Sequence, residues 1–352
     1  MRSDLRALAA AAATLLAGLM VLALGLELAG YDAGAALAAL GNGAFGSWDA
    51  FTGGTLVRAV PLILIGLGFA LALRGGALNI GAEGQFYLGA TAATWVGVHA
   101  VGWPAWVALP AVAAAGMVAG ALWMVVPVVL RLRFGVLEVI STLLLNFVAD
   151  ALVSFLVLGP MQEPSGIYPQ SAPIAQGARL PLVPGTRLHS GLFAALCIAG
   201  GLSWVFARTW WGFRLLALGT SPRAAEVSGR VPAARMLATA LFGSAALAGL
   251  AGAFEVSGVS YALYQNLSPG YGFTAIAVAL LARLRPSAII LTGVVFGALE
   301  AGAGAMQRDA GIPAAAVYVA EAVIILVLLL GDAAARRRVL HAPAVDTADG
   351  AR

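Results

Sequence analysis

The chain has 352 residues, of which 61% are hydrophobic and only 10% are charged. A soluble globular domain carries about 25% charged residues, so this composition excludes a soluble domain and indicates a protein with many membrane-spanning helices. The formal net charge is +4, but the basic residues stand at the ends of apolar segments and form no patch with interleaved aromatic residues, which argues against nucleic-acid binding.

Apolar segments predict ten membrane-spanning helices with both chain termini in the cytoplasm. The first is longer than the apolar region of a signal peptide, so we expect it to stay uncleaved. In the seventh, the small residues Ala245, Gly249 and Ala253 predict a face for close helix packing. The eighth is interrupted by Pro269 and Gly270, and such non-helical backbone is tolerated at membrane depth where protein buries it or a water-filled cavity adjoins it. The ten segments cover about residues 7–28, 55–73, 83–100, 104–130, 137–158, 188–207, 233–256, 259–284, 287–304 and 313–330.

The arginines support this topology, because basic loops stay cytoplasmic. Arg179, Arg187 and Arg308 fall outside, Arg58 lies within a span, and the remaining arginines fall on the cytoplasmic side. The outer segments are a glycine-rich stretch at 30–54, with room for a short amphipathic helix, and a loop at 159–187 that is too rich in proline for regular structure. The predicted fold is therefore all-α, with one transmembrane domain at residues 1–335 and a disordered cytoplasmic tail at 336–352.

Two features of the composition limit the chemistry of the chain. All 20 basic residues are arginine, and the single cysteine, Cys197, lies inside an apolar run. A phosphate-binding P-loop requires a lysine, so any ATP that drives this chain must bind to another polypeptide. One cysteine cannot form a disulfide within the chain. We expect this chain itself to hold no cofactor and no metal.

A basic segment at residues 208–235 lies between two apolar segments and carries five arginines. Ser221 suits an N-cap, Pro222 suits the first helical position, and Gly229 can end a helix. The pattern predicts a small helix at about residues 222–228, lying outside the bilayer on the cytoplasmic side. Two interpretations stay open: the segment only sets the topology, or it docks a cytoplasmic partner.

A second unusual segment, residues 74–90, places polar residues between two apolar spans. Its glycines allow tight backbone turns. Asn79, Glu83 and Gln85 are costly in lipid unless they are paired or face a cavity. Glu83 at a helix start also complements the helix dipole, which is the simpler account of that residue.

The fifth apolar segment carries a polar stripe at steps of four residues. Its members climb about 24 Å along a helix, so the face must meet protein or water rather than lipid. One interpretation is a hydrogen-bonded seam with another helix. The other is that the three middle residues line a translocation path. The stripe consists of Glu138, Thr142, Asn146, Asp150 and Ser154.

Residues 79–85, Asn-Ile-Gly-Ala-Glu-Gly-Gln, closely resemble a motif of ABC importer permease subunits. The similarity is to the branch that serves nucleosides and simple sugars, related to ribose and branched-chain amino-acid permeases. Residues 219–229 resemble the cytoplasmic coupling loop of that family, and 137–146 and 272–281 resemble further family segments. The resemblance covers about residues 55–330.

The resemblance implies a multi-pass subunit of the bacterial inner membrane that moves a nucleoside or related simple sugar by alternating access. It implies three partners: a cytoplasmic ATPase, an external substrate-binding protein and a second, different permease. Residues matching the coupling loop are Gly219, Ser221, Pro222, Arg223, Ala224, Ala225, Glu226 and Gly229. The residues that we assign to the translocation path are Asn79, Glu83, Gln85, Thr142, Asn146 and Asp150.

Two alternatives belong to other classes. An ion-coupled secondary transporter would use intramembrane carboxylates, but it predicts comparable halves of the sequence, and no such repeat is evident. Its carboxylates would be Glu83, Glu138, Asp150, Glu255, Glu300 and Glu321. An intramembrane hydrolase needs a nucleophile with a base or a set of metal ligands. No histidine has a credible partner for this; the three are His99, His189 and His341.

Overall fold

The computed structural model describes residues 16–221 and 232–313, together with single residues between 316 and 330. In these ranges the regular structure is helical and no β-sheet is formed, which confirms the all-α prediction. The chain divides into two compact units, residues 42–301 and residues 1–41 with 302–352. The functional residues discussed below lie in the first unit. The tail predicted to be disordered, 336–352, lies outside the described residues.

The helices are joined mostly by short connections. Two stretches, η1 and η3, are π-helical, and η2 is a single 3₁₀ turn. The elements are α2 (Ala33–Phe45), η1 (Ala50–Leu56), α3 (Val57–Arg74), α4 (Ala82–His99), α5 (Ala105–Trp123), α6 (Val125–Phe134), α7 (Glu138–Val157), η2 (Gln176–Ala178), α8 (Gly191–Arg208), α9 (Trp210–Thr220), α11 (Ala233–Glu255), η3 (Val256–Ser260), α12 (Tyr271–Leu281) and α13 (Pro286–Asp309).

Six of the described helical stretches are long and apolar enough to cross a membrane, judged by length and composition. They are Ala50–Arg74, Ala105–Phe134, Glu138–Val157, Gly191–Arg208, Ala233–Ser260 and Pro286–Asp309. α4 has 18 residues but is not among them, because it carries polar residues that include Glu83 and Gln85. The count of ten spans stays a prediction.

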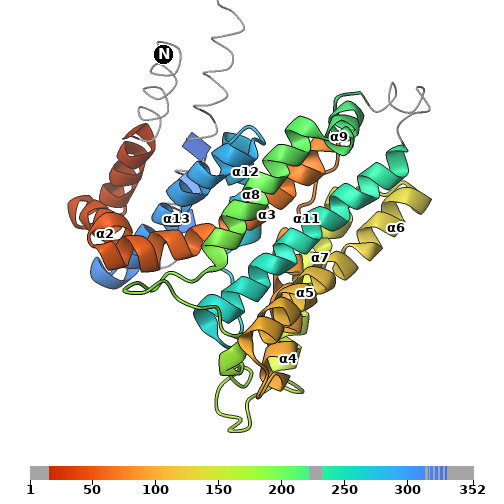
Figure 1. The fold of residues 1–352 in the computed structure, drawn as a ribbon. Coiled ribbons are helices and arrows are strands. Elements are labelled where there is room, and N and C mark those ends of the chain that lie inside the picture. The colour runs from red at the N-terminus through yellow and green to blue at the C-terminus, as the bar shows by residue number, and fades with distance from the viewer. Residues whose placement is uncertain are drawn as a thin grey trace, which may run out of the picture. The chain divides into compact units, whose positions relative to one another are not determined.

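α11 lies at the centre of the unit formed by residues 42–301, where it packs against α3, α4 and α5 (Figure 1). The predicted packing face is confirmed, because Ala245, Gly249 and Ala253 are buried. A Cβ added at Gly249 would overlap the carbonyl oxygen of Gly116 on α5. Small residues thus let the backbones approach closely, as is common between helices in membranes.

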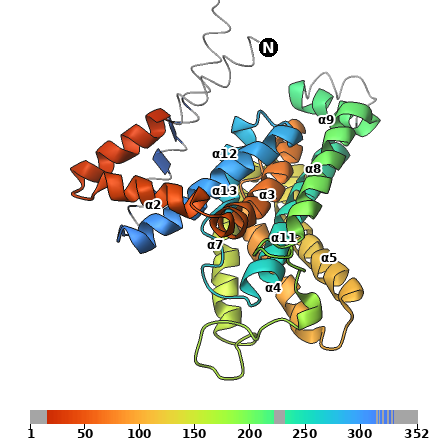
Figure 2. The same cartoon turned by 60° about the vertical axis from the view of Figure 1, so that its left-hand side comes forward.

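The interruption predicted at Pro269 and Gly270 is present. α11 ends in the π-helical η3, residues 261–270 form no helix, and α12 begins at Tyr271. Gly270 has φ +103°, a backbone conformation that favours glycine. α12 has 11 residues and is about 16 Å long, roughly half the thickness of a hydrocarbon core. It packs against α3, as does the part of α13 before residue 302 (Figure 2).

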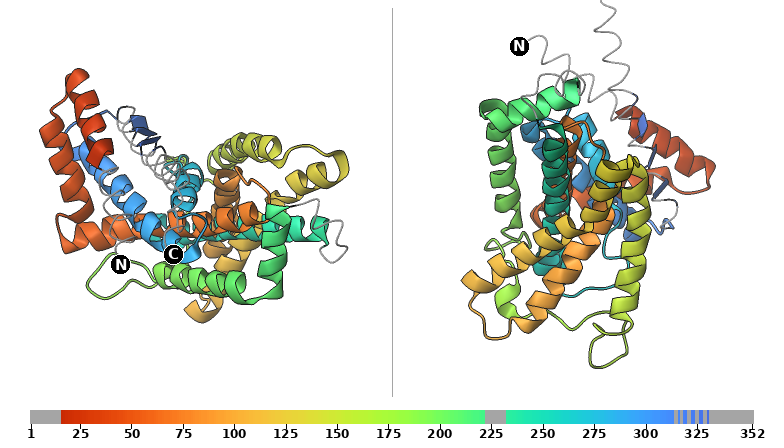
Figure 3. Two further views of the ribbon diagram at one scale, coloured as in Figure 1. Left: turned by 90° about the horizontal axis from the view of Figure 1, so that it is seen from above. Right: turned by 90° about the vertical axis from the view of Figure 1, so that its right-hand side faces the viewer.

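Three local predictions need correction. The segment predicted as one span at 104–130 is one candidate span, Ala105–Phe134, but its helix is longer than predicted and is divided at Met124 into α5 and α6. The outer stretch at 30–54 contains α2 and most of the π-helical η1 instead of a glycine-rich loop with one short helix. The basic segment begins with a helix that was not predicted, α9, and Figure 3 (right) shows this helix crossing the end of α8.

α9 had a readable sequence signal. The side chain of Thr209 accepts a hydrogen bond from Gly212 N at 3.1 Å, so it caps the helix. Gly212, Leu215 and Leu218 recur at steps of three and are buried. The sequence at Ser221 and Pro222 predicts a later helix start, and the predicted helix at 222–228 lies outside the described residues.

Candidate functional site

The polar segment before α4 satisfies its own side chains. Asn79 and Gln85 are each 1% exposed. Their amides form two reciprocal hydrogen bonds, Asn79 Nδ2 to Gln85 Oε1 at 2.8 Å and Gln85 Nε2 to Asn79 Oδ1 at 3.0 Å. Asn79 Nδ2 also donates to Ser244 Oγ on α11 at 3.0 Å, and Gly81 N donates to Asn79 Oδ1 at 3.0 Å. The paired amides therefore fix the turn that leads into α4 and attach it to α11.

The polar stripe on α7 meets this same turn. Asn146 Oδ1 accepts a hydrogen bond from Gly84 N at 2.8 Å, and Asn146 Nδ2 donates to the carbonyl oxygen of Ile80 at 2.9 Å. Thr142 donates to the carbonyl oxygen of Glu138 at 2.7 Å. Thr142 and Asn146 are buried, whereas Asp150 is exposed. Asn146 thus forms the hydrogen-bonded seam with the start of α4, whereas the hydroxyl of Thr142 bonds within α7. The translocation role of all three residues stays a prediction.

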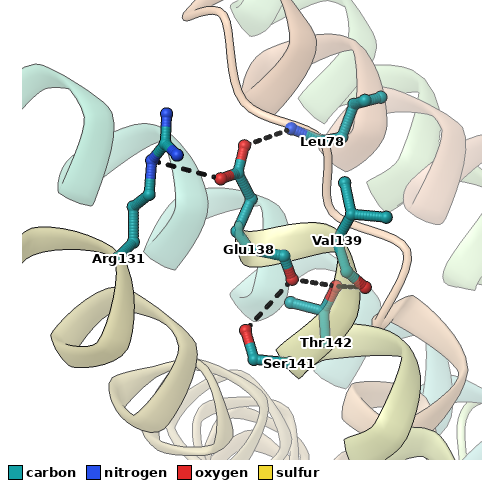
Figure 4. Close-up of polar contacts among 6 residues, drawn as sticks. All are labelled: Leu78, Arg131, Glu138, Val139, Ser141 and Thr142. Carbon is teal, nitrogen blue, oxygen red and sulfur yellow. Dashed lines mark hydrogen bonds and ion pairs between the residues drawn. The ribbon is translucent and has the colours of Figure 1, made fainter. Parts of the chain in front are cut away.

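Glu138, at the start of α7, contacts both the polar segment before α4 and the end of α6 (Figure 4). Its Oε1 accepts a hydrogen bond from Leu78 N at 3.2 Å, and its Oε2 lies 3.3 Å from Arg131 Nε on α6. The carboxylate is buried, so loss of either partner would leave a buried charge poorly compensated. The sequence pattern placed Glu138 in the polar stripe but outside the three residues assigned to the translocation path. The contact with Leu78 joins residues 60 positions apart and has no local signal.

Glu83 joins the beginnings of two helices. It lies in the first turn of α4, and its Oε2 accepts a hydrogen bond from Gly272 N in the first turn of α12 at 2.6 Å. Ser268 Oγ accepts from Tyr271 N at 3.0 Å and interacts with the Glu83 carboxylate. A Cβ added at Gly272 would overlap the backbone of Glu83. The negative side chain thus serves the N-terminal amides of α12, where the helix dipole favours it.

Two of the predicted coupling residues are described. Gly219 packs against the end of α3, where an added Cβ would overlap the carbonyl oxygen of Arg74. Ser221 is exposed, and its N–H donates to the carbonyl oxygen of Ala217 at 3.1 Å, so it ends α9. The other matched residues, 222–229, lie outside the described part of the chain. α9 therefore connects that segment directly to the turn between α3 and α4.

The two described histidines, His99 and His189, each contact backbone groups near them in sequence and do not form a common site. His99 Nδ1 lies 2.7 Å from the carbonyl oxygen of Trp95, and His189 Nδ1 accepts a hydrogen bond from Gly191 N at 3.2 Å. Burial lowers the pKa of His189, in the loop before α8, to about 4. In the ranges that the structure covers, no three histidine, cysteine or acidic residues could share a metal ion.

Comparison with known proteins identifies relatives along most of the chain. The model of the family described as "Branched-chain amino acid transport system / permease component" matches residues 51–330. A glucose ABC transporter permease protein of Haloferax volcanii is 41% identical over 295 residues, 81% of this chain and 77% of that protein. A guanosine ABC transporter permease protein of Bacillus subtilis is 36% identical over 313 residues, 88% of this chain and 89% of that protein. A nucleoside ABC transporter permease protein of Lactococcus lactis is 32% identical over 285 residues, 78% and 77% of the two chains. No solved structure matches the chain.

Proposed function

Because the chain belongs to the family of permease components of branched-chain amino acid transport systems, we propose that it carries a nucleoside or a related simple sugar across the bacterial inner membrane by alternating access. The chain is a permease subunit of an ABC importer. The observation that carries the choice of solute is the similarity along 88% of its length to a guanosine permease protein. Glucose is a second candidate, favoured by the relative that is 41% identical.

The solutes in the relatives' names share one chemical feature. Glucose, guanosine and riboflavin, the last from a probable import permease protein of Treponema pallidum, all carry several hydroxyl groups. A permease for such solutes needs hydrogen-bonding groups in an otherwise apolar membrane domain. This chain has such groups at the start of α4 and of α12, including the buried side chains of Asn79, Glu83 and Gln85. These residues, with Thr142, Asn146 and Asp150, remain our assignment for the translocation path.

We propose that ATP binds to a separate cytoplasmic subunit and acts through the segment at 219–229. α9 carries this segment and contacts α3, α8 and α11. The contact of Gly219 with Arg74 places α9 against the turn that leads to Asn79. Movement of the coupling segment would thereby reach the beginning of α4 without passing through a flexible linker.

The other partners and the orientation rest on the same family resemblance. We propose a heterodimer with a second permease and an extracytoplasmic substrate-binding protein that delivers the solute. Arginines stand in the last turns of α3, α6 and α8, at Arg74, Arg131, Arg133 and Arg208. Under the positive-inside rule these ends lie in the cytoplasm, together with both chain termini.

Uptake of radiolabelled guanosine and glucose by cells with and without this subunit tests the solute. We expect guanosine uptake to be lost on deletion and restored by the gene supplied in trans, and to require the ATP-binding subunit. A deletion strain that still grows on nucleosides but no longer grows on glucose would reject the nucleoside assignment in favour of the sugar.

A further inference from the structure

A half-buried arginine and two buried carboxylates, which we call the charged cluster, interact electrostatically inside the unit formed by residues 42–301. Arg58 is the second residue of α3, Glu255 is the last residue of α11, and Glu300 lies on α13. Sequence reasoning placed Arg58 in a span and gave it no role. The three residues come from helices distant in sequence, so only the tertiary structure brings them together.

Irregular helix geometry adjoins two of the three residues. The π-helical η1 ends at Leu56, two residues before Arg58, and the π-helical η3 begins at Val256, directly after Glu255. π-Helical turns are rare and frequently occur at functional sites. The broken segment before α12 lies beside them, because Tyr271 interacts electrostatically with Arg58, Glu255 and Glu300. Three departures from regular helix geometry therefore lie beside this cluster.

The carboxylates of this cluster are buried but not saturated. Glu255 is 7% exposed and Glu300 is 8% exposed. The charge of Arg58 acts on both, yet no ion pair within 4.0 Å and no hydrogen bond to either carboxylate forms among the described residues. Their oxygens are also not among the fully enclosed atoms without a partner, so water can reach part of each carboxylate. A carboxylate kept in this state retains free capacity to accept hydrogen bonds.

Aromatic side chains complete the surroundings. Tyr271 is 4% exposed, and its ring lies edge-on to Phe86 with 5.9 Å between the centroids. Tyr264, which interacts with Glu255, is 37% exposed. Apolar and aromatic walls with a few convergent polar groups are characteristic of sites for small molecules.

Glu83, which joins the beginnings of α4 and α12, differs from the carboxylates of this cluster. Its charge acts on Glu300, but one of its own oxygens is occupied by the N–H of Gly272. Glu83 therefore serves the protein backbone, whereas Glu255 and Glu300 have acceptors to spare. A nearby fixed cation also makes the cluster unsuitable for a metal ion, because Arg58 would repel it.

We propose that Arg58, Glu255 and Glu300 form a station inside the membrane domain that binds hydroxyl groups of the solute during its passage. The two carboxylates accept hydrogen bonds from neighbouring hydroxyls, and the guanidinium donates to a ring or hydroxyl oxygen. Such charge-assisted hydrogen bonds are stronger than neutral ones. This inference rests on the proposed function, because it requires a solute with several hydroxyl groups.

The test compares solutes that differ only in their hydroxyl groups. The complete importer is reconstituted in proteoliposomes with its ATP-binding subunit and substrate-binding protein, and initial uptake rates are measured for guanosine and 2′,3′-dideoxyguanosine, then for glucose and 2-deoxyglucose. Because every permease variant receives the same substrate-binding protein, a change in the ratio of the two rates arises in the permease.

We expect the unaltered complex to favour the hydroxylated solute. Glu255→Gln and Glu300→Gln should each lower the ratio of rates about fivefold, the difference between charge-assisted and neutral hydrogen bonds. Glu138→Gln is the matched control for removal of a buried carboxylate, and it should change both rates by the same factor. If Glu255→Gln does not insert into the membrane, Glu255→Asp keeps the charge, shortens the reach and should shift the same ratio.

Two results overturn the station. One is an unchanged ratio in both glutamine variants, and the other is an equal fall in both rates, as for Glu138→Gln. Failure of the proposed function looks different: the unaltered complex would then import neither pair of solutes although ATP is hydrolysed and the subunits assemble.

Discussion

The hydrogen-bonded seam between α4 and α7 gives the most direct test of the buried polar network. Asn146→Ala removes the acceptor of Gly84 N and the donor to the carbonyl oxygen of Ile80, which lie at 2.8 and 2.9 Å. Asn146 is 5% exposed, so water replaces these partners poorly. Each buried group left unpaired costs about 1–3 kcal/mol, which gives a total loss of about 2–6 kcal/mol in the free energy of unfolding.

Thermal unfolding of the purified protein in nanodiscs measures this loss. For a chain of this size each kcal/mol lowers the midpoint temperature by roughly 2 °C, so we expect a decrease of about 4–12 °C. Thr91→Ala is the matched control on α4, because Thr91 donates only to the carbonyl oxygen of Tyr87 in its own helix, at 2.8 Å. It should change the midpoint by no more than about 1 °C. Equal midpoints for Asn146→Ala and the unaltered protein would refute the reasoning that this side chain joins the two helices.

Three further predictions concern coupling, access and pH. Ala225→Glu should abolish uptake with normal expression and membrane insertion, because a bulky charge cannot enter a groove of the ATPase; normal transport would leave the segment as a topology signal alone. In a Cys197→Ser background we expect Asp150→Cys to react with a small water-soluble thiol reagent, since Asp150 is exposed. Thr142→Cys and Asn146→Cys, which lie at buried positions, should react only when trapped ATP changes the conformation. Unreactive cysteines in every state would place this face in a dry seam. Burial lowers the pKa of His189 to about 4 from about 6.5 in the unfolded chain, so the unfolded chain binds more protons and stability falls by about 3 kcal/mol as the pH decreases from about 6.5 to 4; unfolding curves of His189→Gln should lack this step.

Much of the membrane architecture follows from the sequence, because lipid imposes local constraints. A spanning helix must satisfy its backbone within itself and must be apolar over its length, so six helical stretches of sufficient length and hydropathy match predicted spans. The break at Pro269 and Gly270 is likewise local, since it depends on a missing N–H and on the backbone angles of one residue. The packing face at Gly249 was readable from the spacing of small residues.

The partners of the polar residues were decided by the tertiary structure alone. The sequence requires that Asn79, Glu83 and Gln85 be paired or face a cavity, but it does not say which. The Asn79 amide contacts Ser244, 165 positions away, and Glu83 accepts from Gly272, 189 positions away. A hydrogen bond carries no periodicity along the chain, so such pairs leave no pattern in a single sequence. For the same reason the sequence did not predict the cluster of Arg58, Glu255 and Glu300. In this cluster, three helices remote in sequence bring one cation and two carboxylates together.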